Sequence, residues 1–486
     1  MSTAFTVARN TVYLSLSTSL ALCIALGFNV FLARTLGVER FGEYSFAISF
    51  IALFSVLVEF SLDSVIIRDV ARDPTTAGKY FSNTLALKGL LFLLTITLVS
   101  MTASILDYPS EVRLLLYILS LGLLLDGVTK CCVSLFSAAQ RMQCPAALFI
   151  AERLLFALFG LVAVSLQGSV IAIVVCYVAA QAVTQLAGIV LVRQELRLKA
   201  EAVQYAFCKR LAQRASPFFA ISMVAAVYAD IDKVFLFSMQ DEIAVGLYAA
   251  AYKLVTIPTR FSNAFHQALY PVLSQQANLS DRRLLTETYR RSMRYLILGS
   301  VPLAVGTTAL AKPIICEIYG QSYVGGTVAL QILIWAYALE FFNPFFGRVL
   351  FATGQQQIAL AAVSASAGLN IALNIILIPR FGFVAAAVAT LLSAGVIFVL
   401  FFYRMLCMFP NVSLGTLVFK PAFAGLVMWI VCHLLGGLPL IPLAILGAFV
   451  YCGCLVLTKA FSAEELLTFR RVLVLHTETL RRRREI

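Results

Sequence analysis

The sequence predicts an all-α integral membrane protein with about fourteen membrane-spanning helices, and three observations carry this prediction. Of the 486 residues, 61% are hydrophobic and only 13% are charged, and the mean hydropathy is +0.92. A soluble globular protein carries about 25% charged residues. Apolar runs of about 20 residues, the length that crosses a bilayer, recur along the whole chain with short gaps between them.

These apolar runs define the expected helices in chain order. The first run is longer than the roughly 7–15-residue apolar region of a cleavable signal peptide, and no small-residue cleavage site follows it. It is therefore expected to remain as a span. Two neighbouring pairs are separated only by Gln167-Gly168 and by the segment 436–439. The predicted spans are 11–33, 41–62, 81–106, 112–136, 145–166, 169–192, 215–238, 244–272, 293–316, 326–351, 358–378, 382–405, 415–435 and 438–458.

The distribution of Lys and Arg predicts the orientation in the membrane. An even number of spans places both termini on one side, and the segments on that side hold 26 of the 37 basic residues. The opposite side holds 5, and 6 lie within spans. Because basic residues accumulate on the cytoplasmic side, both termini are predicted to be cytoplasmic. Topology and contact with anionic lipids then account for the net charge of +13, and no nucleic-acid partner is expected.

Three pairs of segments indicate an internal repeat. "VFLARTLGVERFGEY" (30–44) aligns without gaps with "VFLFSMQDEIAVGLY" (234–248), 204 residues later. "LFSAAQRMQ" (135–143) is similar to "LFATGQQQI" (350–358), and "QGSVIAIVV" (167–175) is similar to "FGFVAAAVA" (381–389). The two members of each pair occupy the same place in a six-span unit: after the first span for the first pair, after the fourth for the second and after the fifth for the third.

Spans 1–6 and 7–12 are therefore interpreted as two copies of one unit. Because six is even, the copies are parallel, and transporters hold substrate sites between such halves. Chance similarity among apolar segments is the alternative explanation. The resulting division is a first lobe at 1–200, a second lobe at 201–408, two further spans at 409–460, and a basic cytoplasmic tail at 461–486.

Several longer motifs carry a family resemblance. They are "LARTLGVERFGEYSFAIS", "SLDSVIIRDVARD", "DIDKVFL", "GLYAAAYKLVTIPTRFSNAFHQALYPVLSQ", "FATGQQQ" and "LNIILIPRFGFVAAAVATL". Together they resemble the polysaccharide-transport branch of the MOP (multidrug/oligosaccharidyl-lipid/polysaccharide) exporter superfamily, the flippases of O-antigen and exopolysaccharide repeat units. The chain departs from that family at Ser61, where glycine is common, and at the acidic Glu59 and Asp63.

The resemblance implies two six-helix lobes in a V around a central cationic cavity. It also implies a flippase in the bacterial cytoplasmic (inner) membrane that moves a polyprenyl-diphosphate-linked oligosaccharide from the cytoplasmic to the outer leaflet. Membrane lipids and the polysaccharide polymerase and ligase machinery are the other partners that it implies.

Basic residues inside spans are candidate substrate-binding groups, because buried charge is costly in a membrane. Lys253 and Arg260 are seven residues apart on one helix, about 20° short of two full turns, and so share a face. Pro258 between them is expected to bend that helix. Arginine suits phosphate oxygens, which makes the pair the leading candidate for holding a diphosphate. Snorkelling of Lys253 and pairing of Arg260 with a carboxylate form the alternative.

Further candidates for the substrate are Arg153, Lys88 and Arg348, with the alternative that each lies at a span end or rim. His266 is expected to be structural.

Acidic residues in spans are candidates for ion coupling. Asp126 precedes Lys130 by four residues, a favourable spacing for a helical ion pair, and structural pairing is the expected reading for Lys130. Lys233 is expected to neutralise either Asp230 or Asp232, which leaves the other carboxylate for a proton or sodium ion. Glu340 in the tenth span is another candidate.

Other chemistry is not indicated. The chain has no GxxxxGK[ST] phosphate loop, and every connection is too short for a soluble catalytic domain. No enzyme activity, catalytic residue, cofactor or metal site is expected, and the eleven cysteines, without paired CxxC spacing, are read as apolar fillers. The alternatives to a glycan flippase are a cation-coupled small-molecule exporter of the same superfamily and a membrane enzyme of glycan assembly.

Overall fold

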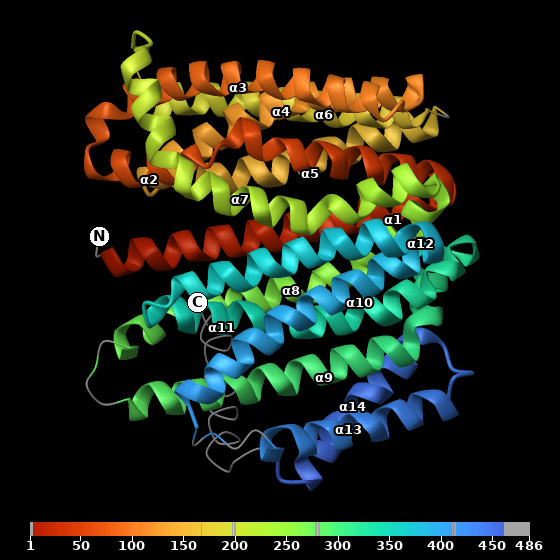
Figure 1. Ribbon diagram of the computed structural model, residues 1–486. Helices are drawn as coiled ribbons and strands as arrows, with labels where there is room; N and C mark the ends of the chain where they lie inside the picture. The colour runs from red at the N-terminus through yellow and green to blue at the C-terminus, as the bar shows by residue number, and fades with distance from the viewer. Residues whose placement is uncertain are drawn as a thin grey trace, which may run out of the picture. The chain divides into compact units, whose positions relative to one another are not determined.

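The computed structural model describes residues 3–166, 168–196, 198, 201–277, 279, 282–410, 412 and 415–460, and every regular element among them is helical. The predicted tail at 461–486 lies outside the described residues. The elements are α1 (Thr3–Glu59), α2 (Leu62–Arg72), η1 (Pro74–Thr76), α3 (Ala77–Ile105), α4 (Ser110–Ala138), α5 (Gln143–Ser165), α6 (Val170–Glu195), α7 (Tyr205–Met239), α8 (Glu242–Ala277), α9 (Arg283–Tyr319), η2 (Gln321–Gly326), α10 (Thr327–Leu339), α11 (Asn343–Ala352), α12 (Gln356–Met408), α13 (Gly415–Leu434) and α14 (Leu440–Leu457) (Figure 1).

The predicted fold class is confirmed, and the count of fourteen spans is approximate. Ten helices of the described residues are long and apolar enough to cross a membrane. Two helices, α1 and α12, each cover two predicted spans and change direction at Gly37 (φ 76°) and Gly382 (φ 58°). Glycine adopts these left-handed φ values without the steric penalty of a Cβ atom. The charged helices α7 and α8 are not among the ten.

Two connections that the sequence marks only weakly are real breaks. α5 ends at Ser165 and α6 begins at Val170, while α13 ends at Leu434 and α14 begins at Leu440.

The predicted tenth span is broken in the structure. α10 ends at Leu339 and α11 begins at Asn343, so residues 340–342 form a turn in the middle of span 326–351. Pro344 lies in the first turn of α11. It has no N–H to donate, and its ring would clash with the carbonyl group four residues earlier in a continuous helix. The proline therefore explains why one apolar run makes two helices.

Two further helical segments extend beyond the predicted spans. α2 follows the second span, and its buried residues Leu62, Val65, Ile66 and Val70 have the spacing of one helical face. The segment was predicted as a connection because its polar residues interrupt the apolar run. α7 begins at Tyr205, ten residues before the predicted start at 215, so most of that connection is helical.

The chain folds as two compact units, each described here by itself. Unit 1 contains residues 1–250, 318–323 and 367–386, and unit 2 contains residues 251–317, 324–366 and 387–486. The division into lobes at 1–200 and 201–408, followed by 409–460, stays a prediction.

Unit 1 brings together the two copies of the repeated segment. A Cβ atom on Gly42 would lie 1.9 Å from the carbonyl oxygen of Glu242, and one on Gly246 would lie 2.2 Å from the carbonyl oxygen of Val38. Glu242 and Gly246 are the counterparts of Val38 and Gly42, 204 residues later. The contact is therefore reciprocal, as a two-fold relation between the copies requires. Only glycine permits so close an approach of two backbones.

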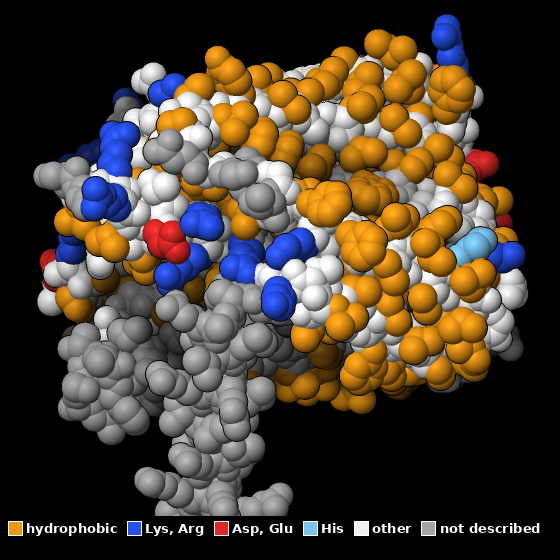
Figure 2. All heavy atoms as spheres, turned by 90° about the horizontal axis from the view of Figure 1, so that it is seen from below, with side chains coloured by type: hydrophobic (Ala, Val, Ile, Leu, Met, Phe, Trp, Pro, Cys, Tyr) orange, Lys and Arg blue, Asp and Glu red, His pale blue; other side chains and the backbone are white. Residues whose placement is uncertain are grey.

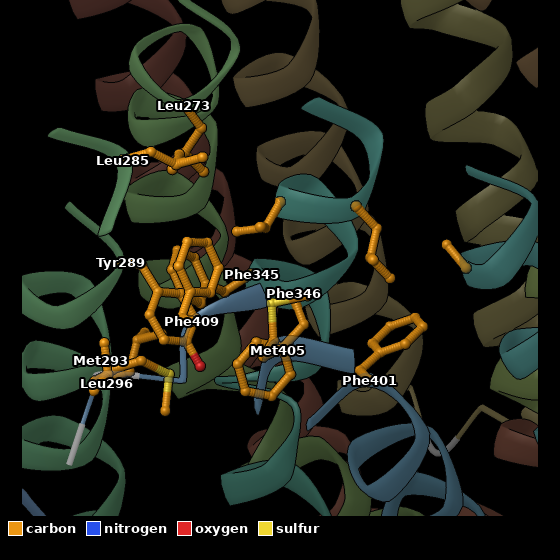
Figure 3. Close-up of a cluster of buried hydrophobic side chains, with 14 of the residues drawn as sticks. Leu273, Leu285, Tyr289, Met293, Leu296, Phe345, Phe346, Phe401, Met405 and Phe409 are labelled. Atoms are coloured by element: carbon orange, nitrogen blue, oxygen red, sulfur yellow. The ribbon is translucent and has the colours of Figure 1, made fainter. Parts of the chain in front are cut away.

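Unit 2 has an aromatic core between α8, α9, α11 and the end of α12 (Figure 3). Tyr289 of α9 stacks on Phe345 and Phe409, with ring centroids 5.7 and 4.3 Å away. Residues of α11 also reach this core, where Phe345 and Phe346 are fully buried. The core therefore anchors α11, whose N-terminus is the helix break described above.

The last two helices pack as a hairpin against α9 (Figure 1). The Tyr451 hydroxyl donates a hydrogen bond of 3.1 Å to the carbonyl oxygen of Leu298. Over α9, α13 and α14, hydrophobic side chains cover most of the face in Figure 2, and Lys and Arg gather toward one end. Phe449 and Leu457 on α14 are 73% and 83% exposed. Such a surface suits contact with lipid and not with water.

Candidate functional site: polar clusters within the helices

The junction between α1 and α2 is a sharp elbow with an acidic residue on each side. Phe60 and Ser61 both have left-handed φ values, 47° and 51°. Glu59 precedes them and Asp63 follows them. Both carboxylates are paired with lysines of other helices, and we name Glu59, Asp63, Lys88, Asp126 and Lys130 the elbow cluster.

Lys88 is the buried member of the elbow cluster. Its side chain is 1% exposed, and its ammonium group lies 3.2 Å from the Asp63 carboxylate and donates to the Gly127 carbonyl oxygen at 2.9 Å. Lys88 was a candidate for the substrate. That role stays a prediction, and in the structure the ammonium group joins Asp63 to the backbone at Gly127.

Lys130 is the other cation of the elbow cluster. It pairs with Asp126 at 2.8 Å, as the four-residue spacing predicts, and it also pairs with Glu59. The sequence did not indicate the contact with Glu59, because that residue lies 71 positions away on another helix. The two lysines explain how the chain accommodates the acidic residues Glu59 and Asp63 beside the elbow.

Arg153 lies on α5, and its side chain is 39% exposed. Its guanidinium group is 3.6 Å from the carboxylate of Glu152 and hydrogen-bonds the Tyr177 side chain on α6. The guanidinium group of Arg153 is thus held by two neighbouring side chains, and the side chain remains partly exposed.

A second group of polar residues, the α7 cluster, comprises Asp230, Asp232, Lys233, Tyr248, Asn370 and Asn374 of unit 1. Lys233 pairs with Asp230 at 2.6 Å, so the expected local neutralisation of one carboxylate is present. Asp232 accepts hydrogen bonds from the Tyr248 hydroxyl at 2.7 Å and from the Asn374 amide at 2.6 Å.

The α7 cluster is buried, and one of its amide oxygens has no hydrogen-bond donor among the described residues. Asp232 is 3% exposed and Asn374 is fully buried. The Asn374 amide nitrogen also donates to Asn370, while its oxygen has no hydrogen-bond partner among the described residues. A carboxylate and an amide oxygen are ligands that suit a hard cation. Neither Asn370 nor Asn374 was identified from the sequence as a site residue. Two asparagines four residues apart in an apolar run are the signal that could have found them.

Unit 2 holds a third group at the break between α10 and α11, the break cluster of Ser262, His266, Glu340, Asn343 and Arg348. The Asn343 amide donates to the Ala394 carbonyl oxygen at 3.1 Å and lies 3.4 Å from the Glu340 carboxylate. The α8 residue His266 is fully buried, and its Nε2 lies 3.0 Å from the Phe341 carbonyl oxygen. Its structural role fits this geometry.

Three buried polar atoms of the break cluster have no hydrogen-bond partner within the described residues. They are His266 Nδ1, Asn343 Oδ1 and Arg348 Nη1. An unsatisfied buried polar group costs about 1–3 kcal/mol. The break therefore concentrates polar groups, and Arg348 and Glu340 of this cluster are both predicted site residues.

Lys253 and Arg260, the leading candidates for the diphosphate, both lie on the unit 2 part of α8. α8 runs unbroken as a helix through Pro258. Both side chains are exposed, and in the part of the chain that the structure describes the Arg260 guanidinium has no ion-pair partner. Of the candidates for the substrate, Lys88 and Arg153 lie in unit 1, whereas Lys253, Arg260 and Arg348 lie in unit 2.

No metal centre is formed by His, Cys, Asp or Glu side chains of the described residues, and the described cysteines are free thiols.

Comparison with known proteins places these clusters in a transporter fold. A lipid II flippase MurJ in an inward closed conformation matches with a TM-score of 0.79 at 16% identity, over 93% of this chain and 99% of that chain. A multidrug resistance MATE transporter of the MOP superfamily, in an inward-facing conformation, matches with a TM-score of 0.66 at 15% identity, over 83% of this chain and 100% of that one. At these identities the likeness concerns the fold alone.

Sequence relatives are more specific. The probable low-salt glycan biosynthesis flippase Agl15 of Haloferax volcanii is 25% identical over 372 residues, 75% of this chain and 76% of that protein. The lipid II flippase MurJ of Bacillus subtilis is 24% identical over 157 residues, 32% of this chain and 29% of that protein. The MatE family model matches residues 217–376. The model of the polysaccharide biosynthesis protein family matches residues 7–277, more than half of the chain, and the chain belongs to that family.

Proposed function

We propose that this protein is a flippase that moves a polyprenyl-diphosphate-linked oligosaccharide from the cytoplasmic to the outer leaflet by alternating access. The family, the glycan flippase Agl15 among its relatives and the many membrane-spanning helices support transport rather than catalysis. The observation that carries the proposal is the pair of exposed cations on α8, Lys253 and Arg260. A diphosphate is the most strongly charged part of such a substrate, and a membrane helix has few other reasons to expose two cations on one face.

The division of labour among the cations follows from their surroundings. Arg260 offers a planar fork to phosphate oxygens, and Lys253 adds a point charge about two helical turns away on the same face. Arg348 of unit 2 is proposed as a secondary contact with the diphosphate or the glycan, and the role of Arg153 in unit 1 stays a prediction. Lys88 is not included, because Asp63 and the Gly127 carbonyl oxygen already engage its ammonium group.

Substitution of the two α8 cations tests the substrate site. Arg260→Ala is expected to weaken substrate binding by about 2 kcal/mol, because a hydrogen bond to a charged group contributes about 1.5–3 kcal/mol. Arg260→Lys should recover part of the loss, since it keeps the charge but not the fork. Arg290→Ala on α9 is the matched control, because that arginine is also exposed. Protein level in the membrane and glycan delivery to the outer leaflet are measured together. Normal expression with undiminished delivery in a Lys253→Ala, Arg260→Ala double variant contradicts the site.

Coupling to an ion gradient is proposed to run through Asp232. The chain has no phosphate-binding loop for ATP, so work must come from an ion gradient or from removal of the product by polymerase and ligase machinery. Among the acidic candidates, Asp230 and Asp126 are paired with lysines. Asp232 is buried and accepts hydrogen bonds from Tyr248 and Asn374, and among the described residues the amide oxygen of Asn374 has no hydrogen-bond partner. The proton or the sodium ion is proposed to bind at this carboxylate beside the amide oxygen of Asn374, because both are oxygen ligands that suit a hard cation. Glu340 in the break cluster is the second candidate.

Replacement of Asp232 by Asn tests the coupling. The change is nearly isosteric, so Asp232→Asn is expected to leave membrane insertion intact and to abolish the dependence of transport on a proton or sodium gradient. Tyr248→Phe removes one donor but keeps the carboxylate, and it should retain the dependence. Gradient-driven transport is measured in vesicles with each ion varied separately. Unchanged gradient dependence in Asp232→Asn would assign coupling to another group, with Glu340→Gln as the next variant.

A second candidate function is the cation-coupled export of a small molecule. The match of the MatE family model to residues 217–376 favours it. The two functions differ in what accumulates when the gene is deleted. Loss of the flippase leads to a lipid-linked oligosaccharide in the cytoplasmic leaflet, which mass spectrometry of extracted lipids detects. Loss of an exporter instead raises the sensitivity of the cell to small cationic compounds and leaves the lipid-linked glycans unchanged.

A further inference from the structure

A basic pocket of unit 1 lies apart from all three polar clusters. It has a volume of about 210 Å³ and forms between the start of α3 and the start of α7. Three of the six lining side chains are the cations Lys79, Arg210 and Arg214. The other three are Tyr80, Phe207 and Leu211. About 30 Å³ is the share of one water molecule in the liquid, so the pocket has room for a phosphate group with part of its ester substituent.

The walls of the pocket are held in place by their own contacts. The α2 residue Asp69 accepts hydrogen bonds from the Tyr80 hydroxyl at 2.8 Å and from Arg214 at 2.9 Å. The Lys79 ammonium group lies 5.0 Å from the centre of the Phe207 ring, and the Tyr80 ring packs edge-on against Phe207 at 4.9 Å. These contacts order the walls before any ligand arrives.

The charge of the pocket is not balanced from within. Asp69 offsets one of its cations and is also paired with Arg68 outside the lining. The Arg210 guanidinium uses one N–H for the Ala206 carbonyl oxygen at 3.2 Å, which leaves its other donors directed to solvent or a ligand. Three cations against one shared carboxylate make a site for an anion, and two arginines suit phosphate in particular.

The position of the pocket along the helices points to the membrane surface. The third and seventh predicted spans begin at residues 81 and 215, so Lys79, Arg214 and Arg210 lie two, one and five residues outside them. At 1.5 Å per residue these positions are within about 8 Å of the span ends. The headgroup layer on each side of the hydrocarbon core is about 5–7 Å thick. Tyr205, in the first turn of α7, is 81% exposed.

We propose that this pocket binds the phosphate group of a membrane lipid on the side of the membrane that carries the chain's excess of basic residues. The ligand chemistry is a phosphate ester attached to acyl or prenyl chains. A bulk anionic phospholipid and a polyprenyl diphosphate both carry it. Lipid binding at this pocket is separate from the proposed transport function, because none of the lining residues belongs to the proposed substrate or coupling site.

A double variant with a matched control tests the site. Lys79→Gln with Arg210→Gln removes two cations from the lining, whereas Arg72→Gln with Lys209→Gln removes two exposed cations outside it, at the end of α2 and the start of α7. Delipidated protein in detergent is titrated with dioleoyl phosphatidylglycerol, with a polyprenyl diphosphate, with zwitterionic phosphatidylcholine and with inorganic phosphate, and bound ligand is counted by native mass spectrometry. Thermal unfolding of each variant shows that it is folded.

The expected result is a tight first binding event for one of the two anionic lipids that weakens about tenfold or more in the pocket variant, as loss of charged hydrogen bonds implies. The control variant should bind within about twofold of the wild type, because it loses the same charge without losing a contact. Preference for phosphatidylglycerol identifies a bulk lipid as the source, and preference for the diphosphate identifies a glycan carrier. Equal weakening in both double variants, or tight binding of inorganic phosphate with no gain from a lipid chain, overturns the proposal.

Discussion

At the scale of single residues, the pairing of the buried Lys88 predicts a contribution to stability. It is 1% exposed and paired with Asp63, whose own side chain is 26% exposed. Lys88→Met should lower the free energy of unfolding by about 3 kcal/mol, since it leaves a carboxylate and a carbonyl oxygen without their donor. Lys88→Met combined with Asp63→Leu should recover most of that loss, because no unpaired charge remains. Thermal unfolding in detergent measures both.

The control for this prediction is Lys312→Met, an exposed lysine of α9, which should change stability by less than about 0.5 kcal/mol. If Lys88→Met unfolds at the wild-type temperature while glycan delivery falls, the lysine acts on the substrate instead of on the fold.

Sequence reasoning at this scale succeeded where charges are close along the chain. The pairs Asp126–Lys130 and Asp230–Lys233 follow from spacings of four and three residues on a helix. It failed for Glu59 and Asn374, whose partners lie on other helices. The spacing of residues along the chain identifies partners on the same helix only. It does not identify the residue of another helix that a carboxylate or an amide will contact.

At the scale of elements, the break between α10 and α11 is assigned to Pro344. Pro344→Ala supplies the missing N–H and removes the ring, so residues 340–342 should join the flanking helices. Spin labels at Val328 and Phe351, both exposed, would then move apart as the two segments straighten. Double electron–electron resonance measures the distance. Transport is expected to fall, because straightening would disturb the contacts of Asn343 with the Ala394 carbonyl oxygen and of His266 with the Phe341 carbonyl oxygen.

A label distance equal to that of the wild type would mean that packing holds the break open, with Phe345 and Phe346 in the aromatic core as the cause. Val349→Ala, a change on the same helix that leaves the proline in place, is the control and should leave the turn intact.

The existence and order of the helices were predictable, and their interruptions were less so. Hydrophobic runs of spanning length identify helices because a bilayer forces backbone hydrogen bonds to close within the segment. The bend at Gly37 lies in the predicted gap 34–40, and the bend at Gly382 lies one residue past the predicted gap 379–381, since polar residues and glycine occur together there. Pro344 gave no such gap, because it lies among apolar residues, and the polar face of α2 concealed a helix.

At the scale of the whole molecule, the charge asymmetry predicts topology. Reporter fusions at Gln204 and at the C-terminus should be active on the cytoplasmic side, and a fusion at Asp241 should be active outside, because the Gln204 side carries most of the basic residues. The expected readout is opposite activity of a phosphatase and a fluorescent reporter at each site. An external signal at Gln204 would contradict both the orientation and the parallel relation of the two copies.

The reciprocal contact of Gly42 and Gly246 has a consequence for the origin of the chain. A surface in which each copy touches the other through the same residues is the isologous interface of a symmetric dimer. One gene encoding a six-helix protein would already specify both sides of this contact when two of its products met. Duplication and fusion would then only need to supply a connecting segment. A substitution at Gly42 or Gly246 changes one side of the contact today, whereas a substitution at the ancestral glycine would have changed both sides.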